Sequence, residues 1–254
     1  MIVGAQGFTV RKFAQDEAGI AETMKKLAAI GYRTLQVSAF ATIPAERMRA
    51  LADENGLKIV VTHTNPDRIL AEPEVVAREH EIYGCKYVGI GMMPQKYVGS
   101  REGLEQFLKD FDRASRVFRE HGQKLQYHNH CFEYQKFDGA PLIDIMADET
   151  DPELWGFIVD LFWTQVGGRN PATQLRMLEG RVDVCHFKDL AIEGWDKKFA
   201  AIGEGNLCWD EIFEACRDTG VQYAMVEQDD AYGRDPFDEL RISYEYLKRA
   251  GLEF

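Results

Sequence analysis

The sequence lacks the features that mark membrane-spanning, exported and disulfide-bonded proteins. No stretch approaches the roughly 18 uninterrupted apolar residues that a membrane span needs. The N-terminus has no basic stretch followed by a long apolar run, which export requires, so we expect a cytoplasmic protein. The five cysteines are odd in number, are widely spread and form no CxxC pair, which predicts reduced and mostly buried thiols.

Positive charge is also scarce. The formal net charge is -12 at pH 7 and the pI is near 5.0. A nucleic-acid backbone or an anionic membrane would be repelled by most of such a surface. We therefore expect neither as a partner, and expect a small-molecule substrate instead.

The composition indicates one globular domain. The chain has 254 residues, of which 45% are hydrophobic and 28% charged, and this length is enough to bury a large core. It contains no low-complexity segment and no linker rich in Pro, Gly and Ser. We therefore expect a single domain over residues 1–254.

Glycines divide the chain into repeating units, because a helix often ends on a left-handed residue that glycine adopts without strain. Seven glycines close helical patterns: Gly31, Gly56, Gly84, Gly122, Gly180, Gly220 and Gly251. The predicted strands lie near residues 2–7, 33–38, 57–62, 86–91, 124–129, 156–160, 182–187 and 222–227. The predicted helices lie near residues 16–30, 44–55, 72–83, 101–121, 139–149, 170–179, 208–219 and 236–250. Eight alternating units of roughly 32 residues predict an α/β fold, a single (β/α)8 TIM barrel with parallel strands.

A doubly wound open sheet would also alternate strands and helices. Such a sheet normally has a glycine-rich phosphate-binding turn after its first strand, and the segment from Gly4 to Phe8 does not continue as one. The longest irregular segment, Leu190 to Asn206, follows the seventh strand. Loops of that length at the exit of a barrel strand are usually functional.

Four late strands end on, or are soon followed by, a residue that can bind a metal. These residues are Glu133, Asp160, His186 and Glu227. Burying such groups costs several kcal/mol unless they are paired or coordinated, and the C-terminal ends of barrel strands converge on one mouth. Three carboxylates and one imidazole predict a divalent ion, Mn²⁺ before Mg²⁺, Co²⁺ or Zn²⁺. The alternative for any one of them is a helix cap or an ordinary ion pair, but four such endings favour a shared ion.

Two histidines and a lysine flank these candidates. His128 and His130 alternate along a strand and should face the same side, where they could orient substrate hydroxyls or transfer protons; alternatively, backbone groups or carboxylates satisfy them. Lys188 shares the facing of His186 and could neutralise an enediolate oxygen or hold a substrate carboxylate or phosphate. Asp189 could simply be its ion-pair partner.

Three further residues are candidates for substrate binding. Trp163 could form an apolar wall against a sugar ring, or could be plain loop packing. His63 ends the third strand and could line the mouth. Glu204, between two glycines, could approach the site from the long loop or bind backbone amides.

A spaced set of motifs carries a resemblance to a known family. The motifs are the segment from Tyr127 to Glu133 (YHNHCFE), Asp160 to Trp163 (DLFW), His186 to Asp189 (HFKD), Gly203 to Asn206 (GEGN) with Trp209, and Val226 to Asp229 (VEQD). The chain resembles the xylose isomerase-like TIM barrel superfamily, in its sugar phosphate isomerase/epimerase family and a YHNHxxE branch similar to inosose dehydratases and keto-sugar epimerases and dehydratases. The resemblance implies Glu133, Asp160, His186 and Glu227 as metal ligands, and a homodimer.

The chain departs from the ketose 3-epimerases of this superfamily at two positions. They place the first glutamate near the position of Gln126 and have a histidine where this chain has Trp163. Either Glu133 is that ligand displaced downstream, or a histidine of the fifth strand replaces it.

The expected activity is that of a metal-dependent sugar isomerase or epimerase. A divalent ion would bridge a substrate carbonyl and hydroxyl and stabilise the enediolate that forms on proton removal. Glu133 and Glu227 would be the acid–base pair, with Lys188 and His130 assisting.

Three other functions stay open. A keto-sugar or inosose dehydratase, a lyase, would use the same metal and glutamate pair. A metal-stabilised sugar-binding barrel would have no turnover. Phosphodiester cleavage, as in an abasic-site endonuclease of similar fold, would need more histidines than the six present and a basic groove.

Overall fold

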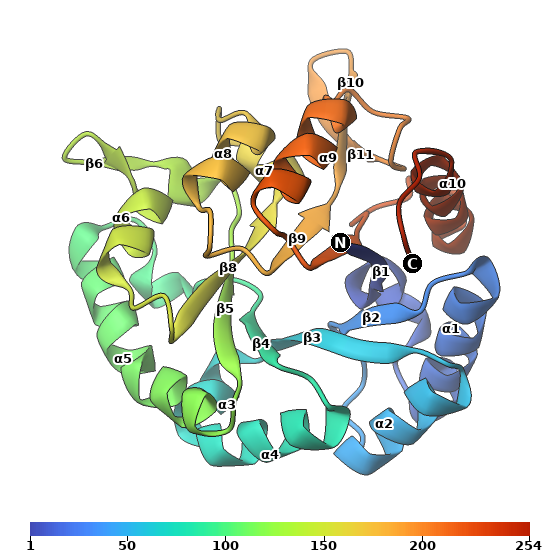
Figure 1. Cartoon of the computed structure of the whole chain (residues 1–254), viewed down its shortest axis with the longest axis horizontal. Coiled ribbons are helices and arrows are strands. Elements are labelled where there is room, and N and C mark those ends of the chain that lie inside the picture. The colour runs from blue at the N-terminus through green and yellow to red at the C-terminus, as the bar shows by residue number, and fades with distance from the viewer.

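The computed structural model describes residues 1–254 and shows a closed barrel of parallel strands ringed by helices (Figure 1). The order around the barrel is β1-β12-β9-β8-β5-β4-β3-β2. Its strands are β1 (Ile2–Gln6), β2 (Thr34–Val37), β3 (Lys58–Thr64), β4 (Tyr87–Ile90), β5 (Lys124–His128), β8 (Trp155–Asp160), β9 (Val184–Phe187) and β12 (Tyr223–Val226). The predicted (β/α)8 TIM barrel is confirmed, and each predicted strand lies within two residues of an observed one.

The helices surround the barrel. They are α1 (Glu17–Ile30), α2 (Ala45–Glu54), α3 (Pro66–Ala71), α4 (Pro73–Tyr83), α5 (Arg101–Glu120), α6 (Leu142–Glu149), α7 (Leu161–Val166), α8 (Pro171–Met177), α9 (Trp209–Asp218) and α10 (Pro236–Arg249). Short 3-10 helices lie at Gly7–Phe13, Gln95–Tyr97 and Phe132–Tyr134. No helix combines the length and the apolar character that crossing a membrane would need.

Two β-hairpins were not predicted. The segment expected to be irregular, Leu190 to Asn206, mostly belongs to the hairpin of β10 (Asp189–Glu193) and β11 (Asp196–Ala200), which projects at the top of Figure 1. A smaller hairpin, β6 (Lys136–Phe137) with β7 (Ala140–Pro141), occupies the start of the expected helix 139–149. Both hairpins interrupt the repeating strand–helix unit, so the period of that unit does not predict them.

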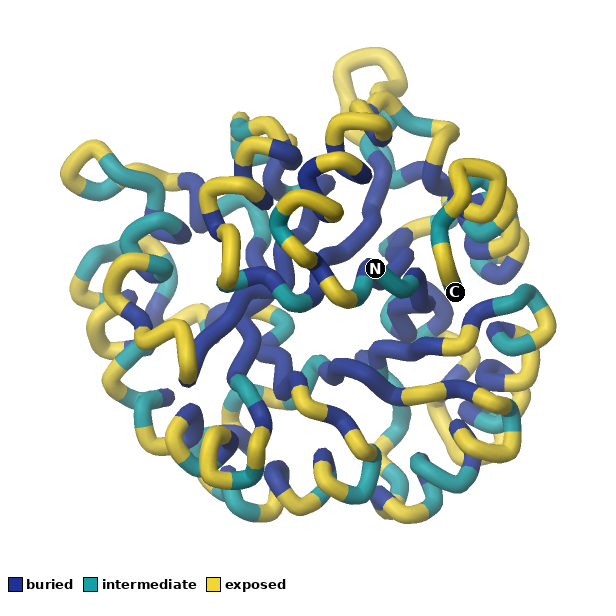
Figure 2. Tube along the Cα trace, in the orientation of Figure 1, coloured by how far each residue is buried: buried dark blue, intermediate teal, exposed yellow.

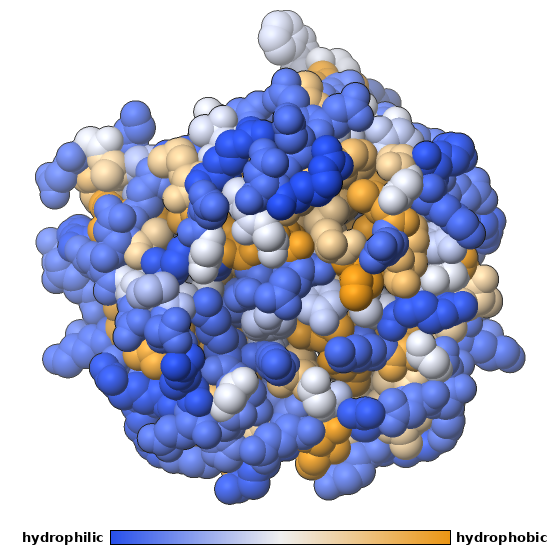
Figure 3. Space-filling model, viewed as in Figure 1, coloured by the Kyte–Doolittle hydropathy of each residue, from blue (hydrophilic) through white to orange (hydrophobic).

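Alternation along the strands separates two buried regions. A core cluster of 57 residues fills the space between the strands and the helices, and Figure 2 shows the buried strands inside a more exposed ring. The exterior in Figure 3 is mostly hydrophilic. A second cluster of six residues includes Ile158, Val184 and Met225. Two residues further along each of these strands, on the same face, come Asp160, His186 and Glu227. The polar side chains therefore lie directly above the apolar residues of the second cluster, toward the C-terminal ends of the strands.

The barrel closes next to both chain ends. β1 pairs with β12, and Ile2 also forms an isolated bridge with Glu253. The Val3 amide donates to the Glu253 carbonyl at 2.7 Å. The last residues of the chain therefore seal the seam beside the first strand, where Figure 1 shows the N- and C-termini close to one another.

Candidate metal centre and active site

Four buried side chains meet at the C-terminal ends of four neighbouring strands. They are His128 of β5, Asp160 of β8, His186 of β9 and Glu227, which follows β12. One donor atom from each lies within 4.8 Å of all the others. Two nitrogen and two oxygen donors at this spacing form a group that could hold a metal ion.

Hydrogen bonding fixes which nitrogen of His128 faces the cluster. Its Nδ1 lies 2.8 Å from the Gly91 carbonyl, which can only accept, so Nδ1 carries the proton. The other nitrogen, Nε2, lies 3.3 Å from Asp160 Oδ2. Burial, and then the neighbouring His186, lowers the pKa of His128. A neutral ring in this tautomer presents a lone pair to a carboxylate, an arrangement that a cation between them would make favourable.

His186 and Glu227 converge in a similar way. His186 Nδ1 lies 2.9 Å from Glu227 Oε2, yet the two atoms are not aligned for a hydrogen bond. Outer partners hold both groups: Gln36 Oε1 lies 2.8 Å from His186 Nε2, and Gln6 Nε2 donates to Glu227 Oε1 at 3.0 Å. Such outer partners orient ligands toward an ion.

The two carboxylate oxygens of Asp160 make different contacts. Its Oδ1 accepts from the Trp163 amide at 2.9 Å and so caps α7, while Oδ2 faces the cluster. The helix-cap alternative is thus correct for Oδ1, and the ligand prediction concerns Oδ2. Burial alone would raise the pKa of Asp160, but the positive charge of Lys188 holds it well below its ordinary value.

Lys188 is the buried cation of the site. Its ammonium lies 3.4 Å from Asp160 Oδ2, 3.3 Å from Glu227 Oε2 and 2.7 Å from Asp229 Oδ1. Burial would lower the pKa of Lys188, but these carboxylates raise it above its ordinary value. Asp160 and Glu227 already outnumber the single ammonium that they both contact, and this excess of negative charge favours a cation.

The structure does not place Glu133 with the other three predicted ligands. The 3-10 helix Phe132–Tyr134 turns its side chain back toward the strand, where Oε1 accepts from the Tyr127 hydroxyl at 2.6 Å. Oε2 accepts from the His130 amide at 2.8 Å. Both oxygens are therefore occupied, and His128 takes the position in the cluster that the sequence assigned to Glu133.

Three unpartnered polar atoms surround the cluster. They are His63 Nε2, His130 Nδ1 and Trp163 Nε1, all buried without a hydrogen-bond partner. The His63 and His130 rings lie 5.0 and 4.8 Å from that of His128, and the Trp163 ring lies 5.6 Å from that of His130. Buried polar groups are rarely left unpaired, so these atoms indicate a polar ligand.

A mouth pocket opens beside these atoms. It has a volume of about 580 Å³. Its 14 lining residues include His63, His130, Asp67, Gln95 and Met92. At Gly91 a Cβ would lie 2.9 Å from His63 Nδ1, so glycine lets β4 approach the imidazoles closely. The pocket therefore lies beside the cluster, with His63 and His130 lining the pocket and contacting the His128 ring.

Two loop residues have other roles than expected. Glu204 is exposed and its carboxylate binds Arg234 at 3.1 Å, so the structure does not bring it to the cluster. Asp189 is fully buried and is not the partner of Lys188. Its carboxylate accepts hydrogen bonds from the amides of Leu190, Gly203, Gly205 and Leu207 and from Trp209 Nε1. It therefore holds the loop that follows β11.

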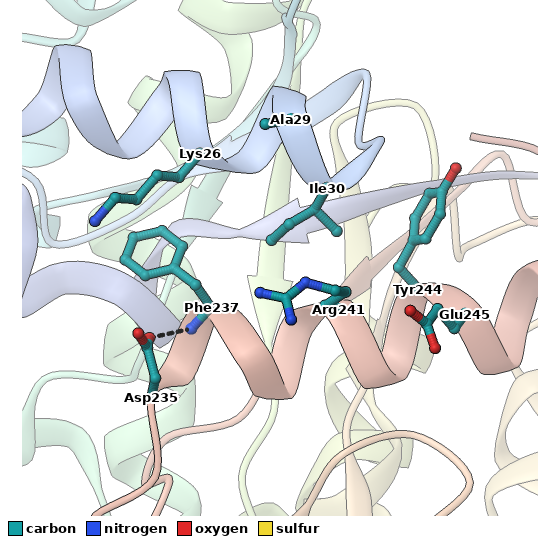
Figure 4. Close-up of a pocket in the computed structure, with 8 residues that line it drawn as sticks. All are labelled: Lys26, Ala29, Ile30, Asp235, Phe237, Arg241, Tyr244 and Glu245. Atoms are coloured by element: carbon teal, nitrogen blue, oxygen red, sulfur yellow. Dashed lines mark hydrogen bonds between the residues drawn. The ribbon is translucent and has the colours of Figure 1, made fainter.

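Another cavity lies on the outside of the barrel. It has a volume of about 400 Å³ and is lined by residues of α1, of α10 and of the cap of α10, drawn in Figure 4. Lys26 lies over the Phe237 ring at 4.8 Å, and Asp235 caps α10 by accepting from the Phe237 amide at 2.9 Å. Its polar groups thus serve the packing of the two helices.

Sequence reasoning missed three supporting residues of the site and expected His128 to bind substrate. Gln6, Gln36 and Asp229 support the cluster, and His128 belongs to it. Asp229 lies within a quoted motif, and a histidine of the fifth strand was the alternative ligand to Glu133. Gln6 is the last residue of β1 and Gln36 lies within β2, and an isolated glutamine gives no comparable signal.

Comparisons with known proteins bear on the fold and the family. The sequence model of the family described as xylose isomerase-like TIM barrel matches residues 24–250. No curated protein matches the chain. A solved sugar phosphate isomerase/epimerase from Parabacteroides distasonis ATCC 8503 is 23% identical, covers 97% of each chain and superposes with a TM-score of 0.81. A probable 3-DHS dehydratase from Bacillus anthracis is 14% identical, with 98% of this chain and 99% of that one covered and a TM-score of 0.75.

A solved L-ribulose 3-epimerase is 11% identical, with 98% of this chain and 94% of that one covered and a TM-score of 0.74. At these identities the solved structures show a shared fold, whereas the family match spans most of the sequence. The chain belongs to the xylose isomerase-like TIM barrel family.

Proposed function

We propose that the protein is a metal-dependent isomerase or epimerase that acts on a sugar or keto-cyclitol by removing a proton next to a carbonyl. The observation that carries this proposal is the facing pair of His128 Nε2 and Asp160 Oδ2. Because the Gly91 carbonyl fixes the tautomer of His128, this pair favours a cation between the two atoms. The unpartnered nitrogens of His63, His130 and Trp163 favour a hydroxylated ligand.

The ligand set bears on the choice of ion. Sequence reasoning expected three carboxylates and one imidazole, whereas the cluster has two of each. Imidazole donors suit transition ions better than Mg²⁺, and carboxylates suit Mn²⁺. Mn²⁺ remains the proposed ion, with Co²⁺ or Zn²⁺ as substitutes.

When bound, such an ion would polarise the substrate carbonyl and stabilise negative charge on its oxygen. Glu227 is our proposed base. Burial would raise its pKa, but Lys188 and His186 lower it below the ordinary value, so it stays ionised. Gln6 holds its other oxygen and thereby orients it. The unpartnered atoms of His63, His130 and Trp163 would bind substrate hydroxyls.

A second acid–base group is needed to return the proton. Glu133 was expected in this role, but its oxygens are occupied. Asp229 is the better candidate, because burial and then the charge of Glu227 raise its pKa to about 7. A group with a pKa near neutrality can both accept and donate a proton. Its contact with Lys188 links it to Glu227.

A dehydratase is the second candidate. The probable 3-DHS dehydratase shares the fold over nearly its whole length. Proton removal next to a carbonyl, followed by loss of a β-hydroxyl, would need the same groups. A binding barrel without turnover is the remote third candidate.

The test is proton exchange in deuterated water. The protein, loaded with Mn²⁺ and then freed of excess ion, is incubated with ketoses, inososes and 3-keto sugars, and deuterium at carbon is measured by NMR on the separated sugar. A new stereocentre indicates an epimerase, and a lost hydroxyl indicates a dehydratase. Exchange should vanish in Glu227→Gln and persist in Glu179→Gln, an exposed control. No exchange with any compound would contradict the proposal.

A further inference from the structure

The mouth pocket offers no positive side chain to a substrate. None of its 14 lining residues is a lysine or an arginine, and the one carboxylate among them is Asp67. Proteins usually bind a phosphate through Arg or Lys side chains or through backbone amides at a helix N-terminus. The Asp67 amide at the start of α3 already donates to Asn65 Oδ1 at 2.8 Å. The pocket therefore lacks both usual means of binding an anion.

The cations near the pocket are engaged elsewhere. Arg68, which follows Asp67 in the chain, binds Glu72 and Glu79. Lys188 is surrounded by Asp160, Glu227 and Asp229. Arg11 lies 3.8 Å from the centre of the Phe8 ring and donates to the carbonyls of Phe8 and Asp229. Lys188 thus neutralises buried carboxylates and Arg11 binds loop carbonyls, so neither side chain is free to bind a ligand.

The rim is similar. Lys96 lies 4.6 Å from the centre of the Tyr97 ring, beside Asp110. On the β10–β11 hairpin, Lys198 binds Glu193 and lies over Tyr232, and before α10 Arg234 binds Glu204 and Glu239. Lys197 is exposed on the projecting hairpin. The charge of Lys96 is shared between Asp110 and Asp67. A phosphate in the pocket would thus meet the Asp67 carboxylate with no lysine or arginine among the lining residues to offset it.

We propose that the substrate is an uncharged polyhydroxylated compound, a free sugar or cyclitol, and that Asp67 acts against a phosphorylated one. This inference rests on the proposed function of the same site. The three unpartnered atoms of His63, His130 and Trp163 match hydroxyl groups, which both donate and accept hydrogen bonds. Asp67 can accept from a further hydroxyl, whereas a phosphate oxygen next to it would be repelled.

The first experiment compares matched pairs in the deuterium-exchange assay: fructose with fructose 6-phosphate, and ribulose with ribulose 5-phosphate. We expect the phosphate to exchange at least about tenfold more slowly than its free sugar, because like charges disfavour its binding. Equal or faster exchange of the phosphates would overturn this inference and leave the proposed function intact. Exchange with no compound of the wider panel would instead contradict the proposed function.

Inorganic phosphate provides a test that needs no turnover. It is titrated into the full chain without added metal, and the side-chain amide NMR signals of Asn65 and Gln95 are followed. We expect no saturable shift, and saturable binding that shifts these signals would overturn the inference.

Substitutions then locate the cause. Asp67→Lys should raise the ratio of phosphate to free-sugar exchange, because it places a cation on the rim. Glu179→Lys changes the net charge equally at an exposed residue before β9, on the opposite face, and should leave that ratio unchanged. Equal effects of both substitutions would contradict a specific role for Asp67.

Discussion

His128 directs Nε2 at Asp160 Oδ2 across 3.3 Å because the Gly91 carbonyl binds the proton on its other nitrogen. The lone pairs of two ligand atoms therefore face each other inside the barrel. Relief of this repulsion is a specific reason for the site to bind a cation, and it leads to the first prediction.

Divalent ions should stabilise the protein. An ion that binds only the native state adds about 2.7 kcal/mol when its concentration is 100 times its Kd. For a chain of this size that corresponds to a rise in Tm of roughly 5–10 °C. Differential scanning fluorimetry with Mn²⁺, Co²⁺, Zn²⁺ and Mg²⁺, each followed by a chelator, measures it. Asp160→Asn should abolish the shift; a shift that persists would place the ion elsewhere.

His128→Gln should weaken binding of the ion. Removing one of four ligands should cost at least about tenfold in affinity, by analogy with the loss seen for weaker outer partners. Isothermal titration calorimetry with Mn²⁺ measures the affinity. His121→Gln, at a surface histidine that binds Glu81, is the matched control. Unchanged affinity in His128→Gln would exclude this histidine as a ligand.

Glu133→Gln should change how stability depends on pH. Burial raises the pKa of Glu133 from 4.5 to about 7, although the Tyr127 hydroxyl opposes the shift. Between these pH values the native state binds more protons here than the unfolded state, so this group's contribution to stability falls as the pH rises. Glutamine cannot titrate, so the difference in free energy of unfolding between wild type and variant should change over that window. Urea unfolding at pH 5 and pH 7.5 tests it, and a constant difference would contradict the raised pKa.

Trp163→Phe should weaken substrate binding and leave the fold intact. The aromatic face remains, but the Nε1–H donor that now lacks a partner is lost. One hydrogen bond contributes about 0.5–1.5 kcal/mol, so KM should rise roughly two- to tenfold. Trp195→Phe, at the exposed tip of the β10–β11 hairpin, is the control. Equal KM values for both variants would show that Trp163 serves packing alone.

Asp189→Asn should destabilise the protein. The carboxylate accepts hydrogen bonds from four backbone amides and from Trp209, and an amide group would turn a donor toward some of them. Leaving a buried donor unsatisfied costs about 1–3 kcal/mol. The free energy of unfolding from urea titration measures it, with Asp196→Asn on the exposed hairpin as control. No loss of stability would mean that the loop keeps its shape without this anchor.

Periodic features were predictable from the sequence, and local turns were not. Strand ends at Asp160, His186 and Glu227 follow from the alternation of apolar residues and from the barrel topology, because parallel strands bring their ends to one mouth. Glu133 lies beyond its strand, where the direction of a side chain depends on the turn. The 3-10 turn at Phe132–Tyr134 sends it back to Tyr127, and no spacing rule predicts that. The role of Asp189 was hidden for the same reason, since its partners are backbone amides.

The position of Lys188 has a consequence for how the centre is assembled. An ammonium already holds Asp160, Glu227 and Asp229 together, and the rings of Phe199 and Trp163 lie 5.1 and 5.4 Å from it. The carboxylates are therefore gathered by the chain's own counter-ion. We therefore expect these side chains to keep their arrangement without an ion, so that binding of an ion would require little rearrangement of the barrel.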